Sequence, residues 1–239
     1  MTIIEIKNLS HRFPDGSMGL DGVSLTIQKG EVVIITGENG SGKTTLLRHL
    51  NGLLIPDEGE ARVAGISVSK NPVQVRQLVG MVFQDADSQI VGETVFEDIA
   101  FGPENLCLEK KEIDQRVARA LEITGLKGLE EKRPHLLSGG EKRRLAIAGI
   151  LAMEPEIIVF DEPFSNLDYP GTLQVIEQIR RLEKMGRTII MTTHDPEKMA
   201  PFANRLLIMR RGKIAASFKP GMAPTDMRKF GVNFSGTFF

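Results

Sequence analysis

The chain has 239 residues, of which 41% are hydrophobic and 26% are charged, an ordinary balance for a soluble globular protein. Its 30 Lys and Arg residues against 31 Asp and Glu give a net charge of −1, which does not indicate a generally basic nucleic-acid binder. The single cysteine, Cys107, excludes an internal disulfide, and no apolar run approaches the roughly 18–20 residues that cross a bilayer. The first residues alternate like a strand and lack the basic and apolar regions of a signal peptide.

The N-terminal part of the chain is predicted to form strands. Residues 3–9 and 23–27 have strand patterns, and Pro14-Asp15-Gly16 marks a turn between them. Phe13 comes just before that turn, and its ring either packs in the core or stacks on an adenine base; the local sequence leaves both open. Residues 31–36 are β-branched and apolar, which predicts a short buried strand.

The next nine residues fit the pattern G-x-x-x-x-G-K-[ST] of a phosphate-binding loop, between that strand and a predicted helix at 43–50. Glycines let the backbone approach an anion, and the loop amides and the helix dipole converge on it. Lys43 supplies charge for the outer phosphates, and the Thr44 hydroxyl suits a Mg²⁺ ligand. The predicted nucleotide-binding residues of the loop are Gly37, Glu38, Asn39, Gly40, Ser41, Gly42, Lys43, Thr44 and Thr45.

The middle of the chain is mostly helical. Predicted strands at 60–63 and 79–83 are followed by a polar loop, 84–89, and by a helix from about 94 to 101 that Pro103 is expected to end. Residues 110–124 are amphipathic, and a further helix is predicted to run to about residue 152. The stretch from about 94 to 151 is therefore predicted to form a helical subdomain within an α/β domain.

A second potential anion site comes directly before that last helix. Ser138, Gly139 and Gly140 offer small residues, free amides and a helix dipole. Because one nucleotide already has the first loop, the second site predicts a nucleotide held between two copies of the domain. The basic run 142–144 raises the alternative of RNA binding, but a solvated helix face is the preferred interpretation.

Three polar residues follow predicted buried strands. Asp161 comes after the apolar run 157–160, as a Mg²⁺-binding carboxylate does. Glu162 is then placed to orient or deprotonate a water near the γ-phosphate. His194 ends the predicted strand 188–193 at the same sheet edge, which favours a γ-phosphate contact.

The last third of the chain continues the alternation of strands and helices, which predicts a mainly parallel sheet covered by helices. Residues 171–185 are predicted to be helical, Asp195 to cap a helix reaching 202, and 206–209 with 213–217 to form a hairpin. The domain is predicted to span residues 1–217, followed by a Phe-rich C-terminal extension, 218–239. That extension is expected to pack on the domain or on a partner, and its deletion to weaken self-association or solubility.

The chain resembles the ATP-binding subunit of ABC transporters over nearly its whole length. The motifs that carry the resemblance are residues 37–45, Gln84, 137–141, Asp161-Glu162, 165–168 and His194. The stretches 12–16, 83–89 and 101–106 are similar, more narrowly, to the ATPases of energy-coupling-factor transporters, which import cobalt or nickel ions and vitamins such as biotin. The implied fold is an α/β P-loop NTPase with a RecA-like core of mainly parallel sheet, an N-terminal antiparallel β subdomain and an inserted helical subdomain.

The resemblance implies an ATPase that binds ATP and Mg²⁺ and drives the import of a small solute by closure of a dimer. Two ATP-binding subunits, identical or related, would close head to tail around two ATP molecules. Ser138, Gly139 and Gly140 of one subunit would then face the γ-phosphate held by Lys43 of the other.

The resemblance also implies roles for single residues. Gln84 would touch Mg²⁺ or the attacking water, Asp168 would help communication across the dimer, and Phe13 would stack on adenine. Many relatives have Tyr where this chain has Phe13, which keeps the ring and loses only the hydroxyl. Gln is commonest where this chain has Glu141, and whether Glu141 contacts the nucleotide is left open.

Partners at the cytoplasmic face of the cell membrane follow from the same resemblance. A transmembrane coupling subunit would dock near residues 84–106, a substrate-binding membrane subunit would be reached indirectly, and no nucleic acid is expected. Glu93, Glu97, Asp98 and Glu104 make the stretch acidic, which suits a basic partner, although an ordinary solvated helix face fits as well. The transported solute is chosen by other subunits.

Two other classes of function compete with transport. A soluble ABC-type ATPase could instead act on DNA or the ribosome, but the long coiled-coil insertion or the second nucleotide domain of such relatives is not expected here. A regulatory module without turnover is disfavoured because the catalytic carboxylate, Glu162, is retained.

Overall fold

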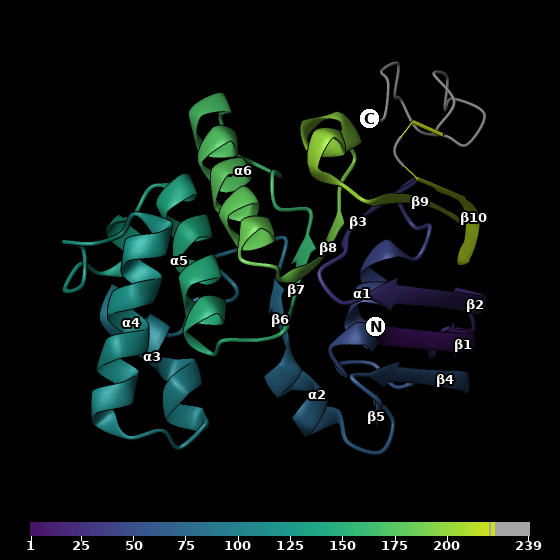
Figure 1. Ribbon diagram of the computed structural model, residues 1–239, viewed down its shortest axis with the longest axis horizontal. Coiled ribbons are helices and arrows are strands. Elements are labelled where there is room, and N and C mark those ends of the chain that lie inside the picture. The colour runs from purple at the N-terminus through teal and green to yellow at the C-terminus, as the bar shows by residue number, and fades with distance from the viewer. Residues whose placement is uncertain (220, 223–239) are drawn as a thin grey trace.

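The computed structural model describes residues 1–219 and 221–222, in two sheets flanked by helices (Figure 1). The predictions for Phe230, Phe234, Phe238 and Phe239 of the C-terminal extension lie outside the described residues. Among the described residues, no helix combines the length and the apolar character needed to cross a bilayer.

An antiparallel sheet is built mainly from the N-terminal part of the chain, in the order β2-β1-β4-β5. Strands β1 (Thr2–Arg12) and β2 (Met18–Gln28) are longer than predicted because the chain stays paired through register shifts that interrupt the alternating pattern. Strands β4 (Glu58–Val63) and β5 (Ile66–Ser67) complete the sheet.

The second sheet has the order β10-β9-β3-β8-β7-β6 and confirms the predicted mainly parallel core. Strands β3 (Val32–Thr36), β7 (Ile157–Asp161) and β8 (Thr188–Thr192) are buried along their whole length, as β-branched and apolar strands covered on both faces should be. Strand β6 (Val79–Val82) forms one edge, and the hairpin of β9 (Arg205–Arg210) and β10 (Lys213–Phe218) forms the other. The carboxyl ends of β3, β7 and β8 therefore meet at one edge, where open α/β sheets bind ligands.

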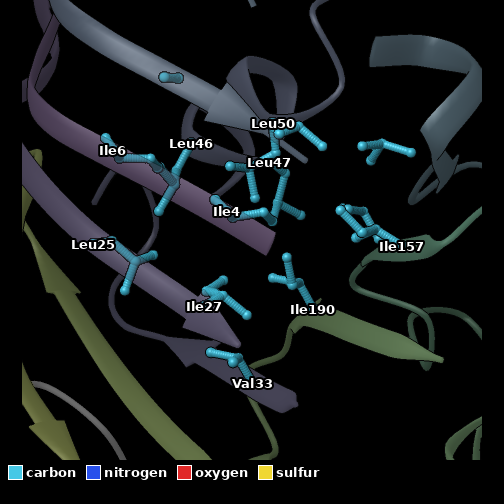
Figure 2. Close-up of a cluster of buried hydrophobic side chains, with 14 of the residues drawn as sticks. Ile4, Ile6, Leu25, Ile27, Val33, Leu46, Leu47, Leu50, Ile157 and Ile190 are labelled. Carbon is cyan, nitrogen blue, oxygen red and sulfur yellow. The ribbon is translucent and has the colours of Figure 1, made fainter. Parts of the chain in front are cut away.

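Helix α1 (Lys43–Leu50) lies between the two sheets. Its Leu46, Leu47 and Leu50 side chains are fully buried and join Ile4 of β1 and Ile190 of β8 in one core cluster (Figure 2). Burying such side chains stabilises the fold by about 1.5–3 kcal/mol each. The loop before α1 is thus held from both sides.

Helices α3 (Val95–Asn105), α4 (Lys110–Thr124) and α5 (Gly139–Ala152) gather on the opposite side of the parallel sheet from the antiparallel one (Figure 1). They share a separate apolar core, whose members include Ile99 of α3, Leu121 of α4 and Leu145 of α5. The bounds predicted for α4 are confirmed.

Helix α6 (Tyr169–Lys184) covers the parallel sheet through apolar residues that share a cluster with Ile158 and Ile189. It begins two residues earlier than predicted, because Pro170 fits the first turn of a helix. The short helix α2 (Pro72–Leu78) precedes β6.

Two predicted helix boundaries are wrong. Helix α3 continues through Pro103 to Asn105, because the residue before the proline is Gly102, which has no Cβ to clash with the proline ring. Asp195 does not cap an α-helix: two 3-10 turns, Pro196–Lys198 and Ala200–Phe202, follow it, since Pro201 cannot continue an α-helix. The Asp195 carboxylate instead pairs with Lys198 at 3.0 Å.

Candidate functional site

The loop between β3 and α1 has the backbone that a phosphate site needs. Gly37, Gly40 and Gly42 have φ values of 144°, 74° and 101°, which favour glycine. A Cβ at Gly37 would lie 2.1 Å from the carbonyl oxygen of Met209, so another residue would not fit there. No side chain caps the start of α1, and its first amides are left free to donate to an anion.

Lys43 points back over this loop. Its ammonium donates to the carbonyl oxygens of Gly37 at 2.8 Å and Glu38 at 3.2 Å. Burial lowers the pKa of Lys43, and the nearby carboxylates of Glu162 and Asp161 oppose that shift. The hydroxyl of Ser41 is buried and has no hydrogen-bond partner among residues 1–219 and 221–222, so the loop holds a polar group that a phosphate oxygen would satisfy.

Thr44 and Asp161, the two predicted Mg²⁺ ligands, are in contact. The Thr44 hydroxyl donates to Asp161 Oδ1 at 3.1 Å, and the Thr192 hydroxyl donates to the same oxygen at 2.7 Å. Thr192 also accepts the backbone amide of Glu162 at 2.9 Å. Sequence reasoning missed Thr192, because a threonine inside a buried strand carries no signal that separates a packing role from a polar one.

Glu162 adopts a φ of 47°, an uncommon backbone conformation for a residue with a side chain, and such positions cluster at functional sites. Its carboxylate accepts the backbone amide of His194 at 3.2 Å, and His194 Nε2 lies 3.2 Å from the other oxygen. Burial raises the pKa of Glu162, and His194 and Lys43 partly offset this. Glu162 and His194, two of the three predicted catalytic residues, thus form one pair, and the third is Gln84.

A cavity of about 400 Å³ brings these groups together. Phe13, Gln84, Glu162 and His194 all line it, although they follow four different strands, β1, β6, β7 and β8, that are far apart in sequence. The Phe13 ring is half-buried and meets His11 edge-on, with its remaining surface at the cavity. Residues 39–45 of the loop complete the lining, together with Ser17, Met18 and Gly19, which sequence reasoning did not include.

The second predicted anion site lies elsewhere in the chain. Among the described residues that line the cavity, Ser138, Gly139, Gly140 and Asp168 do not occur. Ser138 caps α5 by accepting the amide of Glu141 at 3.3 Å, and Asp168 caps α6 by accepting the amide of Gly171 at 2.8 Å. One chain therefore does not bring the two predicted phosphate sites to a single pocket.

Glu141 has a structural contact of its own. Its carboxylate accepts the backbone amide of Ser138 at 2.7 Å, which completes a capping box. This hydrogen bond lowers the pKa of Glu141. The negative charge of Glu141, which a glutamine would lack, thus lies on a carboxylate that accepts a backbone amide at the start of α5.

The prediction of a solvated face for the run 142–144 is wrong for Arg143, which is only 3% exposed. Lys142 pairs with Asp87, and Arg144 donates to Gln174. Arg143 donates to two backbone carbonyls, of Phe83 and Gln84. A basic run on a helix resembles a solvated face in sequence, and only the packing of α5 against the loop after β6 shows otherwise.

Comparisons with known proteins identify the family of this chain. The family described as ABC transporter matches residues 20–165, which include the phosphate loop, Ser138–Gly140 and Glu162. The chain belongs to the ABC transporter family. Its relatives form an ATPase family whose nucleotide is ATP with Mg²⁺.

The most similar relatives of this ABC ATPase include a protein of Methanocaldococcus jannaschii called energy-coupling factor transporter ATP-binding protein EcfA. The two are 47% identical over 95% of this chain and 82% of the relative. Among solved structures, cbiO1 from Clostridium perfringens, described as part of the ABC transporter complex cbiONQ, has a TM-score of 0.83 at 35% identity, covering 91% of this chain and 88% of that one. A dimeric cassette, MJ0796, bound to ADP and Pi, has a TM-score of 0.82 at 28% identity, covering 91% and 98%.

The residues of this chain fit that nucleotide. Free amides and an unpartnered Ser41 hydroxyl face the expected phosphates, and Thr44 and Asp161 present oxygen atoms of the kind that Mg²⁺ prefers. The Phe13 ring offers a flat surface for a base.

Proposed function

We propose that this ABC ATPase powers the import of a transition-metal ion or a vitamin through an energy-coupling-factor transporter. The observation that carries the proposal is the cavity in which Phe13, Lys43, Gln84, Glu162 and His194 converge. The relatives named above, one of them an energy-coupling factor protein and one a part of cbiONQ, support the transporter type.

In the proposed mechanism, the amides of the loop and Lys43 bind the β- and γ-phosphates, and Phe13 stacks on adenine. Lys43 exchanges its bonds to the Gly37 and Glu38 carbonyls for bonds to phosphate oxygens, so its positive charge is already in place before the nucleotide binds. Thr44 and Asp161 would hold Mg²⁺, which would neutralise charge on the phosphates, and Gln84 would contact the metal or the water.

Hydrolysis in this proposal depends on the pair of Glu162 and His194. Glu162 accepts the proton of the attacking water, and His194 steadies the γ-phosphate. Thr192 positions both carboxylates, since its hydroxyl joins Asp161 to the backbone of Glu162. A carboxylate with a raised pKa is the stronger base, which suits this role.

The second half of each site comes from another subunit in this proposal. Ser138, Gly139 and Gly140 start a helix whose dipole favours an anion, yet they lie outside this chain's own cavity. Two subunits, identical or related, that close head to tail would place this helix start on the γ-phosphate of the other. The Ser138 hydroxyl accepts the backbone amide of Glu141, and rotation of its O–H away from the Glu141 carboxylate would let it donate to a phosphate oxygen.

A groove of about 440 Å³ is proposed as the site of the transmembrane subunit. Asp87, Glu93 and Arg133 line it, so it offers both signs of charge. Two of the predicted acidic residues, Glu97 and Asp98, form hydrogen bonds within the chain. They accept backbone amides at and before the start of α3. Large apolar side chains are exposed on residues next to the groove lining, such as Val91 at 62% and Leu136 at 61%, as a docking surface requires.

Binding to a nucleic acid has no support from the described surface. The basic run 142–144, which raised that alternative, is occupied by contacts within the chain. The likeness to the energy-coupling factor relative supports attachment to the cytoplasmic face of a membrane through partner subunits as the proposed location.

Purification of the tagged chain from its own cells, with membranes solubilised in mild detergent, tests this function. We expect a transmembrane protein to co-purify, and its identity also separates pairing of identical chains from pairing of related ones. Cells that carry only the Lys43→Ala chain should lose uptake of one solute among radiolabelled Co²⁺, Ni²⁺ and biotin or another vitamin. A chain that elutes alone and leaves all uptake unchanged would rule out the proposal.

A further inference from the structure

Arg143 forms a buried bridge between helix α5 and the loop that carries Gln84. Its two terminal nitrogens donate to consecutive carbonyl oxygens, Nη1 to Phe83 at 2.5 Å and Nη2 to Gln84 at 2.6 Å. The guanidinium is a rigid planar fork, so two such bonds fix the orientation of the peptide groups as well as their position. A lysine at this position would make no paired contact of this kind.

Among the described residues, the other polar links to this loop are local or exposed, although Ala86 also packs in a core cluster with Ala146 and Ile147 of α5. Strand β6 ends at Val82, and the loop beyond it folds on itself through Gln89, whose side chain accepts the Phe83 amide at 2.9 Å. A second link to α5, the ion pair of Lys142 and Asp87, involves an Asp87 side chain that is 67% exposed. Exposed ion pairs contribute little, whereas the Arg143 head is enclosed.

The bridge joins two elements, helix α5 and the loop that carries Gln84, that would contact different nucleotides in the proposed dimer. Arg143 lies five residues, or about 7.5 Å of helix rise, from Ser138 on the same helix. Ser138 would contact the ATP held by the partner subunit, whereas Gln84 lines the cavity for this chain's own ATP. A rigid helix that is tied to the Gln84 backbone therefore joins one half-site to the other.

We propose that Arg143 is a positioning residue that transmits closure at the partner's ATP, through α5, to Gln84 in this chain's own site. This rests on the proposed head-to-tail dimer and adds a route between its two nucleotides. Movement of the start of α5 toward a γ-phosphate would carry the Phe83 and Gln84 carbonyls with it. Each site would then acquire its Gln84 contact only when the other has closed.

Hydrogen exchange in the Glu162→Gln chain, which should accumulate as a closed ATP dimer, tests the proposal. Peptides covering 83–89 and 138–143 are followed with and without MgATP. A Gly139→Asp chain, which should bind ATP without closing, gives the protection that comes from the chain's own nucleotide alone. We expect closure to slow exchange at 83–89 by about fivefold or more beyond that baseline, the lower end of typical coupling between sites.

Arg143→Met keeps the length of the stem and removes both bonds. We expect it to return exchange at 83–89 to the Gly139→Asp baseline, while 138–143 stays protected in the dimer. Lys142→Met is the matched control, which loses only the exposed ion pair and should keep full protection. If Arg143→Met does not fold, Arg143→Lys, which keeps the charge and loses the fork, should lose most of the protection.

The outcomes separate this inference from the proposed function. A Glu162→Gln chain that does not dimerise with MgATP would remove the head-to-tail pocket and this inference with it. A dimer that forms, but in which Arg143→Met or Arg143→Lys keeps full protection at 83–89, would overturn the inference alone. A dimer in which Arg143→Met also exposes 138–143 would reduce Arg143 to a structural role and likewise overturn it.

Discussion

Lys43 is the residue on which nucleotide binding most depends at the scale of single side chains. It is 7% exposed and donates to two loop carbonyls, so its charge is already aimed at the phosphate position. We expect Lys43→Ala to weaken MgATP binding by about 100-fold or more, because a hydrogen bond to a charged group in an enclosed site is worth about 1.5–3 kcal/mol and the loss of charge adds to it. Isothermal titration measures this.

Lys29→Ala is the control for Lys43→Ala. Lys29 also forms an ion pair, with Glu156 at 2.9 Å, but its side chain is 55% exposed. Its removal should leave the Kd for MgATP unchanged within about twofold, since exposed pairs contribute about 0–1 kcal/mol to stability and Lys29 does not line the cavity. Equal effects of the two variants would contradict the role of Lys43.

The raised pKa of Glu162 predicts the pH at which ATPase activity falls on the acid side of its pH profile. Glu162 must be ionised to accept a proton, so kcat/KM should fall, as the pH drops, at a pH above the ordinary glutamate value of 4.5. The effect of pH on the free energy of unfolding has the opposite sign. Burial disfavours the ionised form of Glu162, so the stability that its protonated carboxyl contributes is present at low pH and is lost as the pH rises through the raised pKa. Binding of MgATP to Glu162→Gln over the same pH range separates titration of the nucleotide from that of the carboxyl. A limb at or below 4.5 would contradict the assignment.

At this scale the sequence was most informative where a residue belongs to a contiguous motif. The glycines and Lys43 of the loop are recognisable because their spacing follows from backbone geometry around an anion. Thr192 and Arg143 were not recognisable from the sequence, because the residues to which they donate hydrogen bonds lie 31 and about 60 residues away along the chain. Their roles depend on which strand and loop the fold places beside them.

At the scale of elements, the turn into α1 is the most constrained. Gly42 has a φ of 101°, and a Cβ there would lie 2.6 Å from the carbonyl oxygen of Gly19 in β2. We expect Gly42→Ala to destabilise the fold by about 1–3 kcal/mol through backbone strain, with the clash in addition. It should also displace the first amides of α1 and abolish MgATP binding. Urea unfolding and titration measure the two effects.

Gly22→Ala is the matched control for Gly42→Ala. Gly22 also has a positive φ, of 63°, but a Cβ there meets nothing within 4 Å. It should show backbone strain alone, of about 1–2 kcal/mol, and should keep MgATP binding. If the two variants were equally unstable and both bound MgATP, close packing of β2 on the loop would not matter for the site.

Element boundaries were predicted best where periodicity is strong. The bounds of α4 follow from its amphipathic pattern and the glycine after it, and the sequence alone supplied them. The end of α3 was predicted wrongly from the sequence, because the effect of Pro103 on the helix depends on its neighbour Gly102 as well as on the proline itself. The extra length of β1 and β2 depends on pairing between strands, which local patterns do not contain.

At the scale of the whole molecule, the fold places the phosphate loop, Asp161, Glu162 and His194 at one edge of the parallel sheet. Ser138 lies at the start of α5, outside the cavity that Glu162 and His194 line. The mainly parallel core was predictable from the alternation of strands and helices. The separation of the two anion sites within one chain was anticipated from the presence of two phosphate motifs, and the described geometry is consistent with it.

The central claim is that the nucleotide pocket is completed by a second subunit through Ser138–Gly140. Light scattering of the Glu162→Gln chain, with and without MgATP, tests it most directly. The account predicts a rise from 26.4 kDa to about twice that mass with MgATP, abolished by Gly139→Asp although that variant still binds MgATP. A dimer that survives Gly139→Asp, or an MgATP-saturated chain that stays at 26.4 kDa, would contradict it.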